Sequence, residues 1–134
     1  MKRMLEELKK LDEKAYDDIC SSFRYAELQW PELWPEYIGE KPYIPDDANL
    51  DDECLLDFIQ GSIQRAIERR GWAYQVSLTF QGTSFGKIIT KNDDGTKRVN
   101  SDHLGDSAAY VLLSAYLSIL RAQARRLFKE VNNR

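Results

Sequence analysis

The sequence predicts an α/β (α+β) domain in which helices flank a small antiparallel β-meander of two to three strands. Three observations lead to this fold. Amphipathic stretches of helical period lie near both ends, a segment of strict alternation lies at 73–81, and turn-rich segments follow it. The predicted order is α-α-β-β-(β)-α. At 134 residues, the chain is expected to form one domain, 1–134, with an N-terminal helix at 1–28, a connector at 29–48 and a core at 49–134.

The first helix is predicted over residues 2–28, because apolar residues recur there at steps of three and four. They are Met4, Leu5, Leu8, Leu11, Ala15, Ile19, Phe23 and Ala26. The opposite face is charged. A narrow apolar stripe on so long a helix favours docking onto a sheet or onto a second copy, and we expect a homo-oligomer.

The connector at 29–48 carries the unit WPEL followed by WPEY, at residues 30–37. Proline fixes its own φ and pushes the preceding residue toward extended backbone, so this segment is predicted to be stiff and extended. One interpretation is a lid over the core. The other is a partner-binding surface, since aromatic residues dominate interface hot spots. The candidate anchors are Trp30, Trp34, Tyr37 and Tyr43.

A second helix is predicted over 50–70, with Asn49 or Asp51 as its N-cap. Gly71 suits the left-handed position after its last turn, and Trp72 suits the apolar contact that often follows. Strands are predicted at 73–81 and 85–91, and a short edge strand at 96–99. The turn signals between them are Gly82 and the run Asn-Asp-Asp-Gly at 92–95.

The last helix is predicted over 103–130, with Asp106 or Asp102 as its N-cap. Apolar residues cover more than half of its circumference between 108 and 120. A helix of this kind is buried on more than one side, so we expect a sheet on one face and a helix or another protomer on the second.

Charge is unevenly distributed along the chain, although the net charge is only −3. Residues 1–67 hold 8 Lys/Arg against 16 Asp/Glu, and residues 68–134 hold 11 against 6. The basic half could face an acidic partner or nucleic acid, or opposite ends of the fold could attract each other. Lys87, Lys91 and Arg98 are the candidate ligands for a small anion.

The expected location is the cytoplasm. No apolar run approaches the roughly 20 residues that a membrane span needs, and the first seven residues lack the apolar stretch of a signal peptide. Cys20 and Cys54 are far apart in the sequence and form no CxxC pair. A disulfide between them is the alternative, but in a reducing compartment both are expected to be thiols packed in the core.

Patterns that could carry catalysis or hold a metal are weak, and we predict no enzyme, no cofactor and no metal site. His103 is the only histidine and has no nucleophile at a fixed spacing, so we expect it on the surface at a helix entry. Five carboxylates at 46–53 lack an EF-hand pattern and suit a helix N-terminus without a metal. The glycine-bearing hairpin at 81–87 is not a P-loop, although its backbone could cradle a phosphate.

Three segments resemble the small phage-encoded α/β/α sandwich domains, over roughly residues 42–122. They are Pro42-Tyr43-Ile44-Pro45-Asp46-Asp47 before the second helix, Arg70-Gly71-Trp72 after it, and Gly105-Asp106-Ser107-Ala108-Ala109 at the start of the last helix. The resemblance implies a phage or prophage accessory protein and carries over no catalytic residue.

The expected function is therefore that of a non-enzymatic phage accessory protein. It would bind a host protein or a small anionic signalling ligand, for example to counter a defence system. The alternative is a nucleic-acid-binding module, since a strand pair followed by a helix of small residues is also similar to double-stranded RNA-binding domains. Its phosphate contacts would be Lys87, Lys91, Lys97, Arg98, Arg121, Arg125 and Arg126. Asp102 and Asp106 oppose it, because they occupy the place of the lysine cluster in those domains.

Overall fold

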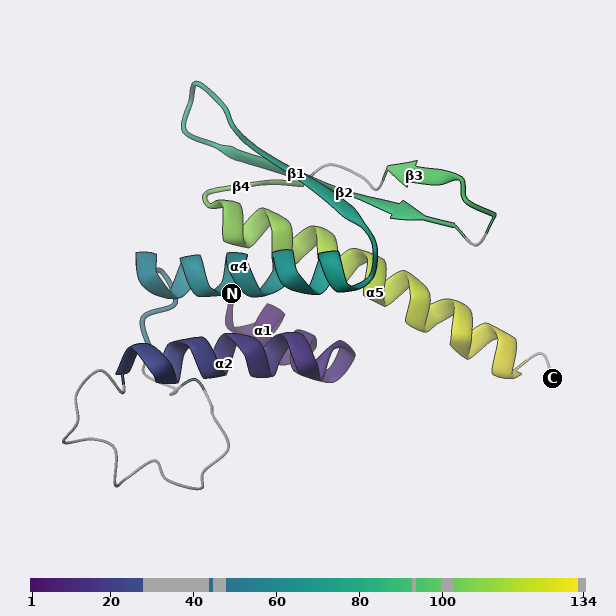
Figure 1. Cartoon of the computed structure of the whole chain (residues 1–134), viewed down its shortest axis with the longest axis horizontal. Helices are drawn as coiled ribbons and strands as arrows, with labels where there is room; N and C mark the ends of the chain where they lie inside the picture. The colour runs from purple at the N-terminus through teal and green to yellow at the C-terminus, as the bar shows by residue number, and fades with distance from the viewer. Residues whose placement is uncertain (28–43, 45–47, 93, 100–102, 133–134) are drawn as a thin grey trace.

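The computed structural model describes residues 1–27, 44, 48–92, 94–99 and 103–132. Its helices and strands, in chain order, are α1 (Lys2–Leu11), α2 (Glu13–Glu27), α4 (Glu53–Arg69), β1 (Ala73–Leu78), β2 (Ser84–Lys91), β3 (Lys97–Val99), β4 (His103–Gly105) and α5 (Ala108–Asn132). Helices packed on a small antiparallel sheet confirm the predicted fold class (Figure 1).

The elements form three layers (Figure 1). The sheet lies over α4 and α5, and α1 and α2 pack beneath these two helices. Helix α5 contacts the sheet on one side and α1 and α4 on the others. This arrangement confirms the expectation that the most apolar helix is buried against a sheet and against other helices.

The single N-terminal helix predicted over 2–28 is wrong, because the chain breaks at Asp12. Its φ of −149° and ψ of 82° interrupt the helix. The Asp12 carboxylate then accepts a hydrogen bond from the Ala15 backbone N–H at 3.2 Å, which caps the start of α2. The break lets α1 and α2 pack against each other with Leu8 and Ile19 in one core. The apolar period runs through the break, so periodicity alone could not reveal it.

Helix α4 begins later than predicted, with Asp52 as its N-cap in place of Asn49 or Asp51. The Asp52 side chain accepts from the Leu55 N–H at 3.2 Å. At the other end the prediction is confirmed. Gly71 has a φ of 73°, and the Trp72 N–H donates to the Ile67 carbonyl at 3.2 Å, as in a Schellman motif.

Within the described residues the sheet has four strands, one more than the predicted maximum. Strand β2 pairs with β1, with β3 and, at its other end, with β4, always antiparallel. The missed strand β4 occupies residues that were predicted to open the last helix. That helix instead begins at Ala108 after Ser107, whose hydroxyl accepts from the Tyr110 N–H at 3.1 Å. The predicted cap Asp106 is therefore wrong, because Ser107 takes that role. The alternative cap, Asp102, lies outside the described residues.

Alternation along β2 divides its side chains between two faces. Ser84, Gly86 and Ile88 are buried against the helices, and the residues between them lie on the outer face. A Cβ on Gly86 would lie 3.0 Å from Val111 Cγ2 of α5, so glycine permits the close approach of helix and sheet. The core beneath includes Ile59, Ile63 and Leu112.

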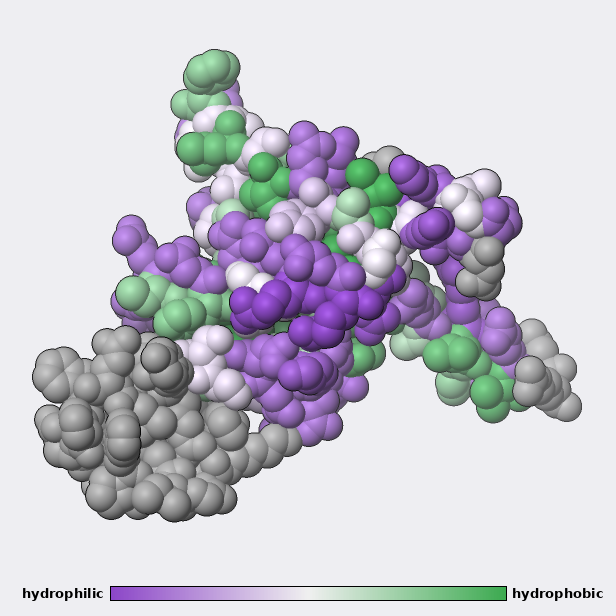
Figure 2. Space-filling model, viewed as in Figure 1, coloured by the Kyte–Doolittle hydropathy of each residue, from purple (hydrophilic) through white to green (hydrophobic). Residues whose placement is uncertain are grey.

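Two parts of the described surface are apolar and project from the body (Figure 2). They are the tip of the β1–β2 hairpin, with Leu78 and Phe80, and the end of α5, with Leu127, Phe128 and Val131. Cys20 is buried, as predicted, but Cys54 is exposed at the start of α4, and both thiols are free. Among the described helices, none combines the length and apolar character needed to cross a bilayer.

Candidate anion-binding cleft

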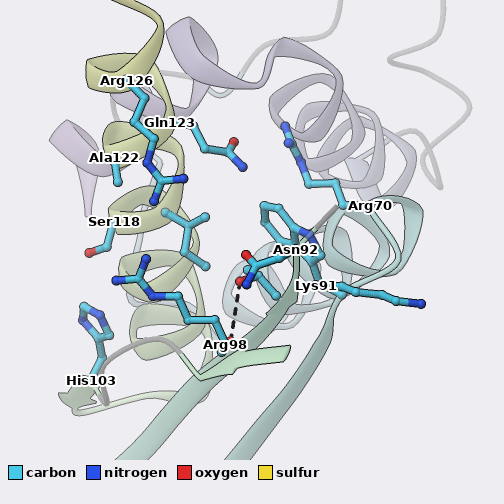
Figure 3. Close-up of a pocket in the computed structure, with 12 residues that line it drawn as sticks. Arg70, Lys91, Asn92, Arg98, His103, Ser118, Ala122, Gln123 and Arg126 are labelled. Carbon is cyan, nitrogen blue, oxygen red and sulfur yellow. Dashed lines mark hydrogen bonds between the residues drawn. The ribbon is translucent and has the colours of Figure 1, made fainter. Parts of the chain in front are cut away.

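A cleft of about 580 Å³ opens between the sheet and the middle of α5 (Figure 3). It is lined by Arg70 and Trp72 from the α4–β1 junction, by Thr90, Lys91 and Asn92 from the end of β2, by Arg98 of β3 and His103 of β4, and by Ser118, Ile119, Ala122, Gln123 and Arg126 of α5. These described lining residues include no aspartate or glutamate. The charged side chains of this described lining are therefore all basic, in a chain whose net charge is −3.

Strand register places Arg98 in this cleft. Arg98 pairs with Thr90, and directly opposed residues of an antiparallel pair share a face of the sheet. That face is the one that carries Ile88 toward the helices. The Thr90 hydroxyl donates to the Arg98 carbonyl at 3.5 Å, at the inner wall of the cleft (Figure 3).

The opposite wall of the cleft is formed by residues of α5 that lie on one face of the helix. Ile119, Ala122, Gln123 and Arg126 recur at steps of three and four, so they share the face of α5 that is turned toward β3. Figure 3 shows the guanidinium groups of Arg126 and Arg98 on the same side of the cleft, with the His103 ring beyond Arg98. Two arginines from different elements thus converge on one space.

These two arginines differ from three others in the molecule. Arg69 forms an ion pair with Asp18 at 3.1 Å, Arg70 lies 3.8 Å from an Asp12 oxygen, and Arg121 makes a bidentate contact with Glu7. For Arg98 and Arg126, no carboxylate of the described residues lies within ion-pair distance. Their positive charges are therefore not neutralised within the described part of the chain.

The rear wall of the cleft is held by a polar network. Arg70 Nε donates to the Tyr116 hydroxyl at 2.8 Å, and that hydroxyl donates to Asp12. Burial raises the pKa of Tyr116 to about 12, and its hydrogen bond to Asp12 acts in the same direction. The Trp72 ring meets Tyr116 edge to face at 6.3 Å, and the Arg70 guanidinium lies 5.2 Å from the Trp72 ring centre. Trp72 is thus fixed from two sides.

The three predicted anion ligands do not lie together. Lys87 and Lys91 are four residues apart on β2 and share the outer face, whereas Arg98 lies on the helix side. Lys91 borders the cleft, but its amino group points away from it (Figure 3). Of the three, only Arg98 directs its charge into the cleft, and the role of all three in binding stays a prediction.

The other predicted candidates are placed as follows. The anchors Trp30, Trp34, Tyr37 and Tyr43 lie outside the described residues, so their role stays a prediction. His103 was expected at a helix entry but lies on β4 and lines the cleft. Among the residues with described positions, no group of three or more His, Cys, Asp or Glu side chains could hold a metal ion.

Sequence reasoning missed most of the cleft. Gln123 and Ser118 gave no separate signal, and Arg126 was noted only as a possible phosphate contact. The spacing of Arg126 from Ile119 was a usable signal, because it places a cation on the same helix face as that apolar residue. The edge strand that carries Arg98 was predicted, but strand β4, which brings His103 to the cleft, was not.

The fold and the cleft define a small α+β domain with a cleft whose charged lining residues are basic. No protein-family model matches the chain, and no curated protein or solved structure shows significant similarity to it. Function must therefore be argued from the cleft itself.

Proposed function

We propose that this protein is a non-enzymatic binding domain that takes a small anionic ligand in the cleft between α5 and β3. One observation carries the proposal. Arg98 and Arg126 face the same space with no carboxylate of the described residues to neutralise them, while the arginines elsewhere that hold helices together are paired. Like charges brought together repel, and an anion between them removes this cost.

The chemistry of the lining supports binding over reaction. Guanidinium groups offer planar, fixed donors that match phosphate and carboxylate oxygens in a bidentate way. Hydroxyl and amide groups from Ser118, Asn92 and Gln123 can complete a hydrogen-bond shell. The described lining holds one potential general base, His103, and no carboxylate to orient it or to bind a metal. Anion capture needs no carboxylate.

The proposal is tested by calorimetric titration of inorganic pyrophosphate into the protein and into a variant with both Arg98→Gln and Arg126→Gln. A hydrogen bond to a charged group contributes about 1.5–3 kcal/mol, so each lost arginine should weaken binding by roughly tenfold or more. Arg125→Gln is the matched control, since Arg125 is an exposed neighbour on α5 that does not line the cleft. Equal affinity for the double variant and the control would overturn the proposal.

The phage origin and a host-protein partner belong to the same proposal but rest on other grounds. Their support is the resemblance of residues 42–122 to phage sandwich domains and the aromatic residues of the connector. Both stay predictions, since the anchors lie outside the described residues.

Nucleic-acid binding stays the second candidate because Arg125, Arg126 and Lys129 are exposed along the end of α5. The phosphate contacts expected for it are divided, however. Arg121 is engaged by Glu7, and Lys87 and Lys91 lie on the far face of the sheet. Fluorescence anisotropy with a labelled duplex would test it, because phosphate contacts weaken steeply as salt rises. Binding that is insensitive to salt would exclude this candidate.

A further inference from the structure

The cleft is larger and more varied than an inorganic anion requires. Its volume of about 580 Å³ lies within the range of roughly 300–1,000 Å³ that is common for sites of drug-sized ligands. Arg98 and Arg126 account for one side of it. Toward Arg70, whose charge is offset by an Asp12 oxygen 3.8 Å away, the remaining polar lining includes the amides of Asn92 and Gln123, and the Lys91 amino group points away from the cleft (Figure 3). A ligand with an anionic end and an uncharged, polar end would complement both sides of this lining.

The side toward Arg70 offers groups suited to a flat heterocycle. Trp72 lines the cleft and is held in place by the Tyr116 ring and the Arg70 guanidinium. A fixed aromatic ring gives contact area without a further loss of side-chain freedom on binding. Nucleobases contact aromatic rings in a way that tolerates any base, because every base has a π-face.

The amides give this side a hydrogen-bonding pattern. Asn92 Nδ2 donates to Thr96 Oγ1 at 2.9 Å, which orients the amide and leaves its oxygen as an acceptor. Gln123 stands across the cleft on α5 with both a donor and an acceptor. Paired donors and acceptors are what the edge of a nucleobase requires.

We infer that the cleft binds a nucleotide, with its phosphate at Arg98 and Arg126 and its base beside Trp72 between Asn92 and Gln123. This inference rests on the proposed function, because it names the ligand class of the same site. The nucleotide can be a free one or the end of a single strand, since both present the same phosphate and base.

The test is calorimetric titration with three ligands: pyrophosphate, ribose 5-phosphate and AMP. If the base is bound, AMP should bind at least about tenfold more tightly than ribose 5-phosphate, because base–aromatic contact and amide hydrogen bonds are both lost without it. Equal affinities would overturn the nucleotide assignment and leave the anion-binding proposal standing. If none of the three ligands binds, both fail.

Variants locate the two ends of the ligand. Gln123→Leu keeps the size of the side chain and removes its amide, so AMP binding should weaken roughly tenfold while pyrophosphate binding stays unchanged. Arg98→Gln should weaken both, and Arg125→Gln neither. Trp72 packs against the core, so it is left intact to avoid unfolding. Equal losses of AMP and pyrophosphate in Gln123→Leu would contradict the placement of the base.

A final titration separates the two sources of a nucleotide. A ten-residue oligoadenylate that binds no more tightly than AMP assigns the cleft to a free nucleotide. If the oligoadenylate binds more tightly than AMP, and the Arg98→Gln variant loses this gain in affinity, the cleft is assigned to the end of a strand. Either result requires a nucleotide in the cleft, whereas an oligonucleotide that binds equally well to Arg98→Gln would exclude the cleft as its site.

Discussion

The arginines of this protein fall into two groups whose surroundings differ. Arg69, Arg70 and Arg121 each contact a carboxylate of α1, α2 or the residue between them, and so join distant parts of the chain. Arg98 and Arg126 face a cleft without such a partner among the described residues. The comparison teaches that a shared residue type can serve two purposes. Paired arginines contribute to the fold, and unpaired ones in a concave site are available to a ligand.

The largest expected effect on the free energy of unfolding comes from removing the Asp12 carboxylate, which serves the network of the paired Arg70. Asp12→Ala removes the cap of α2 and the acceptor of Tyr116, and it leaves Arg70 without its carboxylate. Loss of a cap costs about 1 kcal/mol, and a buried polar group left unpaired costs a further ~1–3 kcal/mol. We expect a loss of roughly 3 kcal/mol in the free energy of unfolding, measured by urea denaturation. Asp12→Asn retains a capping oxygen and should lose less; equal losses would contradict this account.

Tyr116→Phe tests the same network through pH. The pKa of Tyr116 is raised from 10.0 to about 12, chiefly by burial, so its protonated form favours the folded state. Its contribution is complete below pH 10 and is lost as the pH rises through 12. The phenylalanine variant should lose about 1 kcal/mol of stability at neutral pH and show a shallower decline between pH 10 and 12.

Urea denaturation at a series of alkaline pH values measures this decline. Part of it should persist in the variant, because the pKa of Tyr16 is also raised to about 12, mainly by burial. If stability declines identically in the two proteins, deprotonation of Tyr116 does not contribute to the loss of stability at alkaline pH.

A smaller effect is expected at the exposed pair of Arg121 and Glu7, whose side chains are 42% and 32% exposed. Arg121→Ala should cost about 0.5 kcal/mol, because solvent screens such pairs. The hydrogen bond from Arg121 lowers the pKa of Glu7. The contribution is therefore present above the ordinary carboxyl pKa of 4.5 and is lost as the pH falls below it. Thermal melts at pH 7 and pH 3 should differ less in the variant than in the parent, and 1 M salt should reduce the effect.

The smallest effect sharpens the comparison. Arg98→Gln and Arg126→Gln should each change the free energy of unfolding by less than about 0.5 kcal/mol, since neither charge pairs with a described carboxylate. The same variants are the ones expected to weaken anion binding. A loss above 1 kcal/mol in urea denaturation would assign these arginines to the fold instead.

The fold class could be predicted because hydrophobic periodicity and turn-forming residues can be recognised within short segments of the sequence. The alternation of β1 and the glycine after α4 each depend on one short segment of sequence. The glycine was located correctly, and β1 begins at Ala73 as predicted but ends at Leu78, three residues before the predicted end. The break at Asp12 and the strand β4 could not be predicted, because each depends on distant contacts. Asp12 is fixed by Tyr116, 104 residues further along the chain, and β4 exists because Gly86 of β2 pairs with His103.

The candidate cleft was harder to predict than the fold. Arg98 was chosen as one of three basic residues that are close in sequence, but alternation on β2 and β3 sends them to two faces of the sheet. The arginine that meets it, Arg126, is 28 residues away and reaches it only once α5 lies across the sheet. Sequence reasoning finds chemically suitable residues, whereas the pairing register decides which of them meet.

The position of α5 in the chain has a consequence for synthesis on the ribosome. Helix α5 contacts α1, α4, β1, β2 and β4, so all of these elements complete their burial against a helix that is translated after them. Translation adds roughly 5–20 residues per second, so the 25 residues of α5 take on the order of one to five seconds to make. During that interval the emerging chain exposes apolar helix faces and an open sheet. Nascent chains stalled before residue 108 should therefore be good substrates for ribosome-associated chaperones.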